Sequence, residues 1–287
     1  MFLSSRRMPM RRWTIVGYCL LACFFLLPGM SVGAGETIEW SGYQWNVTSS
    51  NGRTQGPGPN IFSDAKENVF LDDEGNLHLR IVKAVGGKWH ASQVTLAESL
   101  GYGTYQWEIS SRYDGLPSNV VVGLFTYNSP HRVAKQTEGE VGNDKPDTAH
   151  EIDIEFTGAW GPGNLFFTTH DPDIQSPGVH FLTHPKSANT THRFEWAPNK
   201  ISWESFEGHA SDTSASILPL TEQRPGKDNG NSVQFSYTGP VIPKDLDEVP
   251  MINFWIFGRK DEQPSLMGPT DGTPQELILR SFKFTPK

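Results

Sequence analysis

The stretch AHEIDIEFTG, residues 149–158, alternates acidic and apolar residues. Successive side chains of a β-strand point to opposite faces. The pattern therefore predicts a strand whose apolar side chains face a core, namely Ile152, Ile154 and Phe156. The carboxylates then share the opposite face, namely Glu151, Asp153 and Glu155.

Carboxylates that share one face of a strand repel one another, and a sheet curved around a cleft also removes part of their water. Both effects raise carboxyl pKa values and split them apart. Glycoside hydrolysis needs this combination, because one ionised carboxylate acts as nucleophile and one carboxylic acid protonates the leaving oxygen. A solvated acidic strand and a calcium site, which gathers oxygen ligands, are the alternatives that the stretch alone leaves open.

The spacing of the two glutamates does not define the reaction by itself. Positions i and i+4 of a straight strand lie about 13 Å apart. The carboxyls of a retaining pair are about 5–5.5 Å apart, and those of an inverting pair about 6.5–9.5 Å. A bent strand and long side chains that lean toward one another are needed to close this gap, so stereochemistry does not follow from spacing.

Short runs of β-branched and aromatic residues recur along the chain between clusters of Gly, Pro, Asn and Asp. No long stretch has helical periodicity. The pattern predicts an all-β sandwich or jelly roll of one domain. In FEWAPNKISW, Pro198, Asn199 and Lys200 predict a tight hairpin turn. The expected strands cover 76–83, 104–113, 119–127, 150–156, 164–170, 192–197, 200–206, 232–238, 251–257 and 276–284.

The first 34 residues predict a signal peptide. Four arginines precede an apolar run over 13–27, and small residues follow, with Val32 and Ala34 at the spacing that signal peptidase favours. The run is short for a membrane-spanning helix, which needs about 20 residues. We therefore expect cleavage after Ala34 and a secreted or periplasmic domain over 35–287. A single membrane anchor is the alternative.

Removal of that segment changes the charge and the cysteine content. It holds four Arg and no acid or Lys, so the net charge goes from −8 to −12 (−8 − 4). Phosphate backbones repel such a chain, so we expect no nucleic-acid partner. Cys19 and Cys23 both leave with the signal peptide. The mature domain then has no disulfide and depends on its core, which a chain of this length can bury.

Two segments are too polar for the expected strands, 128–149 and 207–231. A loop this long in a compact domain is usually functional or disordered. The first segment directly precedes the acidic strand. It is therefore expected either to border a binding cleft or to be a mobile surface excursion.

The stretch EIDIEF resembles the active-site strand of glycoside hydrolase family 16, the β-glucanase, laminarinase and agarase group. It lacks the extra residue of the bulged branch and so is similar to the lichenase-type form. The resemblance extends over nearly the whole mature chain, from Trp40 to Pro286. The further stretches that carry it are GYGTYQWEIS (101–110), HRFEWAPNKISWESFEG (192–208), PMINFWIFG (250–258) and ELILRSFKF (276–284).

The resemblance implies a concanavalin-like β-jelly roll of two curved antiparallel sheets and a retaining reaction. It assigns Glu151 as the nucleophile and Glu155 as the general acid/base. Asp153 matches the helper that hydrogen-bonds the nucleophile. The chain departs from the family pattern at Gln106, at 206–208 and at His150, where many members carry Gly or Asp before the motif. These departures bear on specificity, because none changes the three acids.

Sugar rings present apolar faces that stack on aromatic side chains, so tryptophans near the acids are candidates for substrate binding. Trp160 follows the last acid by five residues, where the strand exits. Asn253 and Trp255 share one face of the strand that resembles the family's late cleft strand. A packing role is the alternative for each. Other tryptophans are expected to be structural, namely Trp107, Trp196 and Trp203.

His170 ends the expected strand that follows the acidic one, and Thr168 shares its face. It is a candidate hydrogen-bond donor near the acids, and a packed or surface histidine is the alternative. No histidine pair has ligand spacing with a matching third partner, and no serine-nucleophile motif or phosphate loop stands out. We expect no cofactor. A calcium ion occurs in some members of the family, but the sequence assigns no residue to it.

The sequence therefore predicts a monomeric, exported, retaining endo-glycosidase that hydrolyses a β-glucan or a related polysaccharide. Two alternatives remain. A transglycosylase would use the same covalent intermediate, and a non-catalytic carbohydrate-binding jelly roll would bind sugar without turnover. No membrane contact is expected after cleavage of the signal peptide.

Overall fold

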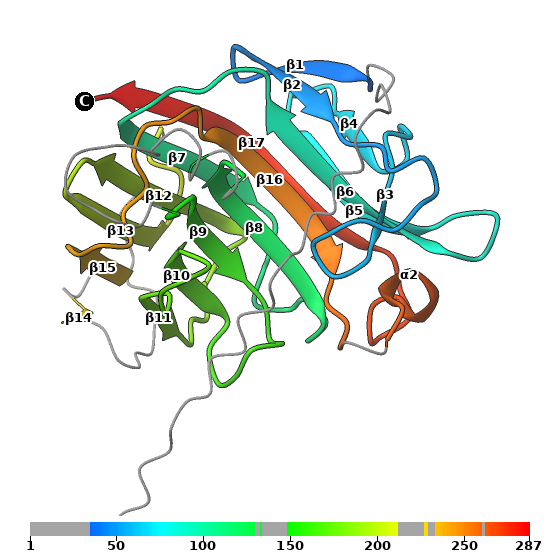
Figure 1. The fold of residues 1–287 in the computed structure, drawn as a ribbon. Coiled ribbons are helices and arrows are strands. Elements are labelled where there is room, and N and C mark those ends of the chain that lie inside the picture. Colours follow the sequence, from blue (N-terminus) through cyan, green and yellow to red (C-terminus); the bar gives the residue numbers. More distant parts are fainter. Residues whose placement is uncertain (1–34, 130–132, 134–147, 212–226, 229–232, 260–261) are drawn as a thin grey trace, which may run out of the picture.

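The computed structural model describes residues 35–129, 133, 148–211, 227–228, 233–259 and 262–287. These residues form a largely β molecule in which two antiparallel sheets pack against each other (Figure 1). The expected signal peptide lies outside the described residues. In the part of the chain that is described, no helix is long and apolar enough to cross a membrane.

The first sheet carries the acidic strand β9. Its strands pair antiparallel in the order β1, β2, β6, β16, β8, β9, β10, β11. Strands distant in the sequence, such as β16 and β8, are therefore neighbours in space. The bounds are β1 Thr37–Trp40, β2 Tyr43–Val47, β6 Trp89–Leu96, β16 Val249–Ile256, β8 Val120–Tyr127, β9 Glu151–Phe156, β10 Leu165–His170 and β11 Gly178–Phe181.

The second sheet packs against the core-facing side of the first. Its strands pair antiparallel in the order β4, β5, β17, β7, β12, β13, β15, β14. The bounds are β4 Val69–Leu71, β5 Leu77–Lys83, β17 Gln275–Pro286, β7 Gly103–Ser110, β12 Asn189–Ala197, β13 Lys200–Glu207, β15 Val233–Tyr237 and β14 Lys227–Asp228.

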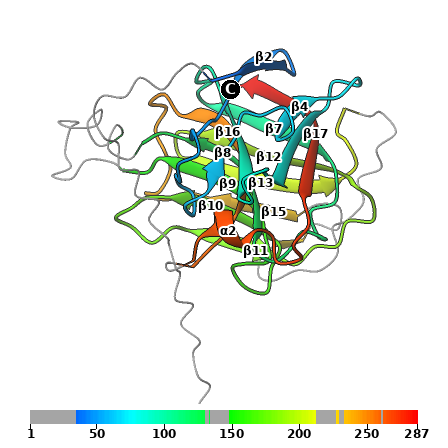
Figure 2. The ribbon, with the colours of Figure 1, turned by 90° about the vertical axis from the view of Figure 1, so that its right-hand side faces the viewer.

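Two shorter features complete the frame. The end of β5 pairs with the start of β6, which links the two sheets, and β3 (Ile61–Phe62) runs parallel to β6. The short helix α2 (Pro264–Met267) contacts β6 and lies at the opposite end of the molecule from the C terminus (Figure 1 and Figure 2).

The core between the sheets fixes which way β9 faces. Its apolar residues Ile152, Ile154 and Phe156 are fully buried in that core. Burial of each such side chain is worth about 1.5–3 kcal/mol, so a one-residue slip of the strand would expose all three and is strongly disfavoured. The core also takes the tryptophans that the sequence predicts to be structural, namely Trp107, Trp196 and Trp203.

The prediction of an all-β jelly roll is confirmed, and each of the expected strands overlaps a strand of the structure. The hairpin turn consists of Pro198 and Asn199, because Lys200 already pairs with Ala197. The two polar segments lie largely outside the described residues. The expectation of no strand in 207–231 was wrong, since β14 falls within that range and β13 extends into it.

The sequence reasoning missed strand β6. Its residues WHASQVTL mix polar and apolar side chains without a simple alternation. Ser92 is fully buried. Its hydroxyl accepts from the Arg80 N–H and lies within hydrogen-bond distance of the backbone oxygens of Asn68 and Arg80, to which its one hydrogen can be donated. A buried polar group with such partners carries little penalty. The strand therefore tolerates a serine at a fully buried position.

Candidate active site

The acidic residues of β9 point to the outer face of the first sheet, opposite to the core. Side-chain exposure is 25% for Glu151 and 4% for Asp153, and Glu155 is partly exposed. The three acids occupy alternate positions of a regularly paired strand, so they share one face as predicted, although Asp153 is buried there. They differ in contact with water, which is a condition for different protonation states.

Strand β8 supplies the neighbours on one side of the acids. The directly opposed pairs are Tyr127 with Glu151, Phe125 with Asp153 and Gly123 with Glu155. The missing side chain at Gly123 makes room for Asn253 of β16, because a Cβ there would lie 2.4 Å from the Asn253 Oδ1 atom. Glycine at position 123 therefore leaves space for the Asn253 amide next to Glu155.

Strand β10 supplies the neighbours on the other side. His170 stands opposite Glu151, and its Nε2 atom lies 3.1 Å from the Asp153 Oδ2 atom. Its Nδ1 atom lies 2.9 Å from the Ser176 hydroxyl. The Asp153 contact has the distance of an ion pair without the alignment of a hydrogen bond, and Oδ2 has no hydrogen-bond partner among the described residues. His170 is thus placed beside the acids, as the sequence predicts.

The environment of Glu155 favours its protonated form. Burial is the largest cause that raises the pKa of this carboxyl well above its ordinary value. The negative charges of Asp153 and Glu151 raise it further, and His170 opposes them. A carboxyl whose pKa is raised in this way holds its proton to a higher pH and can act as a general acid.

His150 belongs to the same group, although sequence reasoning noted it only as a departure from a family pattern. Its Nε2 atom lies 3.6 Å from the Glu151 Oε2 atom. Its Nδ1 atom lies 2.9 Å from the backbone oxygen of Thr148, and its ring packs edge-on against Tyr127. The sequence signal that could have found it is its position directly before the acidic strand.

An aromatic row lies at the Glu155 end of the same face. It consists of Trp160, Phe166, Phe257 and Trp255, with ring centroids 5.5 Å apart for Trp160 and Phe166. The ring centroid of Phe257 lies 6.4 Å from that of Trp160 and 6.4 Å from that of Trp255. Phe166 pairs with Glu155 across β10 and β9. Trp160 is 37% exposed, so it offers the open end of the row.

Trp255 and Asn253 lie on the outer face with the acids, as expected, but both are largely buried. Trp255 packs with Phe62 and Val121, so most of its ring has a packing role. The Asn253 Oδ1 atom has no hydrogen-bond partner among the described residues. Both side chains therefore have little surface open to a ligand in this structure.

The acidic strand is supported from behind by the second sheet. Trp203 of β13 donates its indole N–H to the backbone oxygen of Asp153 over 2.9 Å. Its ring stacks on Phe167 of β10, with centroids 6.2 Å apart. The core thus holds β9 and β10 together at the level of the acids.

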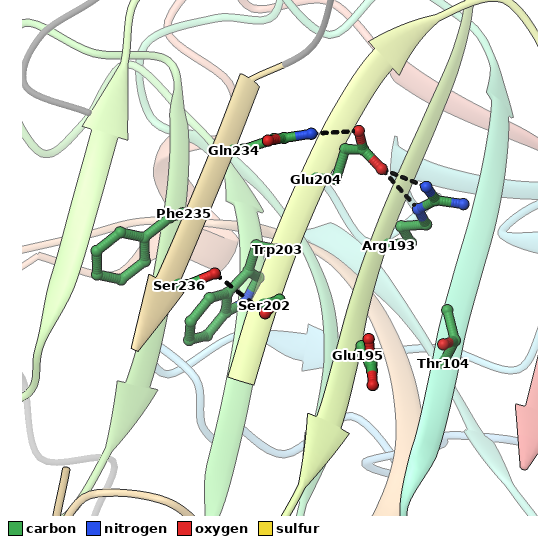
Figure 3. A pocket seen from close by; sticks show the side chains of 9 residues that line it. All are labelled: Thr104, Arg193, Glu195, Ser202, Trp203, Glu204, Gln234, Phe235 and Ser236. Atoms are coloured by element: carbon green, nitrogen blue, oxygen red, sulfur yellow. Dashed lines mark hydrogen bonds and ion pairs between the residues drawn. The ribbon is translucent and has the colours of Figure 1, made fainter. Parts of the chain in front are cut away.

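A hollow of about 450 Å³ lies elsewhere, on the outer face of the second sheet (Figure 3). Its polar side chains bind one another. Arg193 pairs with Glu204, which also accepts from Gln234. None of the residues predicted for the site lines it. Among the described residues, no cluster of His, Cys, Asp and Glu is arranged to hold a metal ion.

Comparison with known proteins identifies solved structures with the same fold. No family model and no curated protein matches the chain. A Bacillus licheniformis β-glucanase is 19% identical, with a TM-score of 0.57, and the match covers 90% of this chain and 100% of that one. A lichenase from a mouse hindgut metagenome is 19% identical, with a TM-score of 0.55 and coverages of 85% and 93%.

A third neighbour is described as an immunostimulatory antigen and pseudo β-1,3-glucanase of Mycobacterium tuberculosis. It is 18% identical, with a TM-score of 0.55, and the match covers 85% of this chain and 91% of that one. At identities this low, the comparison shows a shared fold and no more. The chain therefore has the antiparallel β-jelly-roll fold that these β-glucanase-type proteins share.

Proposed function

We propose that the chain is a retaining endo-glycosidase that hydrolyses a β-glucan or a related polysaccharide. The observation that carries the proposal is the row of acids on the outer face of β9, in which Glu155 has a pKa raised well above its ordinary value. A neutral carboxyl beside other carboxylates is the arrangement that glycoside hydrolysis uses. The glucanase-type fold adds support.

The proposed reaction has two steps. In the first, the Glu151 carboxylate attacks the anomeric carbon while Glu155 gives its proton to the leaving glycosidic oxygen. The C–O bond breaks and a glycosyl ester on Glu151 forms. In the second, Glu155 takes a proton from water, whose oxygen attacks the same carbon and releases Glu151. Two inversions at one carbon return the original configuration.

The neighbours of the acids suit these roles. Asp153 is almost fully buried between the two glutamates, and His170 lies 3.1 Å from its Oδ2 atom. An imidazolium at that position balances part of the negative charge of the site. The negative charge of Glu151 contributes to the raised pKa of Glu155, so the two carboxyls are within electrostatic reach of one another.

The aromatic row and the fold support the proposed substrate class. Trp160 presents a partly exposed ring at the end of the row next to Glu155. Large aromatic rings bury much apolar surface at low entropic cost, which suits the flat faces of a sugar chain. We propose that glucan rings stack there.

A panel of polysaccharides tests the proposal. We expect the purified protein to hydrolyse at least one of lichenan, laminarin, agarose and xyloglucan. Glu151→Gln and Glu155→Gln should each lose most of that activity, by a factor of roughly 10²–10⁴ for the general acid. Undiminished hydrolysis by Glu151→Gln would refute the assignment of roles.

Two other functions fit the same fold. A transglycosylase would pass the glycosyl group to a sugar, and elongated products with excess acceptor would reveal it. The description of the M. tuberculosis neighbour as a pseudo-glucanase favours a second candidate, a protein that binds polysaccharide without cleaving it. Binding to one member of the panel without turnover would support that candidate over hydrolysis.

We also propose that the protein is exported and acts as a monomer without a cofactor. The arginines and apolar run of residues 1–34 support export. Intact-mass measurement of the protein recovered outside the cytoplasm should give the mass of a chain that begins at Gly35. If the protein in the membrane fraction has the mass of the uncleaved chain, with residues 1–34 present, the anchor is favoured instead.

A further inference from the structure

The position before the acidic strand holds a buried histidine that the proposed reaction does not use. His150 is 8% exposed and precedes Glu151, the first residue of β9. Its backbone is fixed on both sides, because its N–H donates to the oxygen of His170 and its own oxygen accepts from the N–H of Asn128. The imidazole is therefore held in place beside β8 and β10.

The hydrogen bonds of the ring fix its tautomer. The Nδ1 atom lies 2.9 Å from the Thr148 backbone oxygen, and a carbonyl oxygen can only accept. Nδ1 must therefore carry a hydrogen. In a neutral ring, the Nε2 atom is then a bare acceptor.

That acceptor faces a carboxylate. The Nε2 atom of His150 lies 3.6 Å from the Glu151 Oε2 atom. Two lone pairs at this separation repel each other, whereas one proton between them makes the contact attractive. The geometry is therefore favourable when His150 is an imidazolium and Glu151 is ionised, or when the shared proton resides on Glu151.

Some neighbouring charges raise the pKa of His150 and others lower it. Asp153 of β9 and Asp171, which follows β10, favour the imidazolium, while His170 of β10 opposes it. On the β8 side the neighbour is the ring of Tyr127. Burial lowers the pKa of His150, and the Thr148 hydrogen bond partly compensates. The imidazolium is thus expected at acidic pH, where a nucleophilic carboxylate most needs help to stay ionised.

We propose that His150 is a positioning residue that holds the proton facing Glu151 and so keeps this carboxylate charged and oriented at acidic pH. The inference rests on the proposed role of Glu151 as nucleophile. In this role His150 acts on the reaction only through Glu151. The contacts of its two ring nitrogens, with the Thr148 oxygen and with Glu151, hold it in place.

Two substitutions separate this role from a structural one. His150→Asn keeps a donor for the Thr148 oxygen but removes the group that faces Glu151, whereas His150→Gln keeps a neutral donor toward Glu151. In His150→Asn, the acidic limb of the kcat/KM profile should move up by about one pH unit, which lowers activity below that limb about tenfold. His150→Gln should fall between wild type and His150→Asn. At alkaline pH, where His150 is neutral, His150→Asn should match wild type.

A measurement without substrate makes the test independent of activity. The Glu151 side chain can be followed by 13C NMR during a pH titration, with Glu151→Gln to assign its signal. Its titration midpoint should rise by about one pH unit in His150→Asn. An unchanged midpoint, or a loss of activity that is equal at all pH values, overturns the pairing. A shifted midpoint in a protein that cleaves no polysaccharide would instead overturn the proposed function and leave the pairing intact.

Discussion

Trp203 and Asp153 join the two sheets at the level of the acids, through a hydrogen bond of 2.9 Å from the indole Nε1 to the Asp153 backbone oxygen. The donor comes from the core of the second sheet and the acceptor from the strand that carries the candidate catalytic residues. Catalytic groups must be held to within a fraction of an ångström. This contact is therefore expected to matter for activity as well as for stability.

Trp203→Phe removes this donor and retains an aromatic ring. We expect the loss of a buried hydrogen bond to lower the free energy of unfolding by about 1–3 kcal/mol and to lower kcat. Trp196→Phe is a matched control, because Trp196 is also buried and donates its Nε1 hydrogen over 2.9 Å, but to Pro243. Urea unfolding should show similar losses for both variants, with reduced kcat for Trp203→Phe only. Equal kcat in the two would show that the Asp153 contact has no part in positioning.

Trp160→Ala tests the aromatic row as a sugar platform. The ring is 37% exposed and packs on Phe166 and Phe257, so its removal should affect the folded state only modestly. Loss of about 1–2 kcal/mol of stacking would raise KM by roughly 5- to 30-fold. Trp160→Phe should recover most of the affinity because it retains a stacking face. Unchanged KM for the polysaccharide in Trp160→Ala would place substrate elsewhere.

The contribution of Glu155 is expected to depend on the leaving group. Glu155→Gln cannot donate a proton, so cleavage of a polysaccharide should fall by roughly 10²–10⁴-fold. A substrate with an activated aryl leaving group needs little protonation, and formation of the glycosyl ester on Glu151 should persist. Added azide should then release a β-glycosyl azide. In wild type, the raised pKa of Glu155 keeps the acid protonated at higher pH, and activity should fall above that pKa.

Glu248 is expected to make stability depend on pH. It is fully buried directly before β16, and burial raises its pKa to about 7. The unfolded chain releases this proton near pH 4.5, so the folded state binds more protons between those values and stability falls as pH rises through them. Glu248→Gln should reduce the stability difference between pH 4.5 and pH 8 by about 2–3 kcal/mol.

Urea unfolding at the two pH values measures this effect of Glu248, with the exposed Glu39→Gln as control. The control should keep the wild-type difference. A Glu248→Gln protein with that same difference would show that the carboxyl is ionised in the folded state at neutral pH.

The sequence was sufficient for the acidic strand because its alternation is strict. Ile152, Ile154 and Phe156 must be buried together, which places the acids together on the other face. The pairing of β9 with β8 and β10 could not be derived in the same way, because it depends on contacts between distant segments. The opposition of His170 and Glu151 was anticipated only in outline, as proximity.

Strand β6 and His150 show where single-sequence reasoning stops. Ser92 looks unsuited to a core, yet distant backbone oxygens satisfy its hydroxyl. His150 lies outside the alternating pattern, so periodicity gives it no role, and only the position of the Thr148 oxygen fixes its tautomer. The partners of Ser92 come from distant segments and that of His150 from two residues upstream, and neither contact follows from the alternation of polar and apolar residues.

The most direct test of the central claim, that the acids of β9 perform double displacement, is the anomeric configuration of the first product. Proton NMR during hydrolysis of lichenan or laminarin should show the β-anomer first, followed by slow mutarotation, with no signal from Glu151→Gln. Initial release of the α-anomer, or an equal rate from Glu151→Gln, would contradict the account.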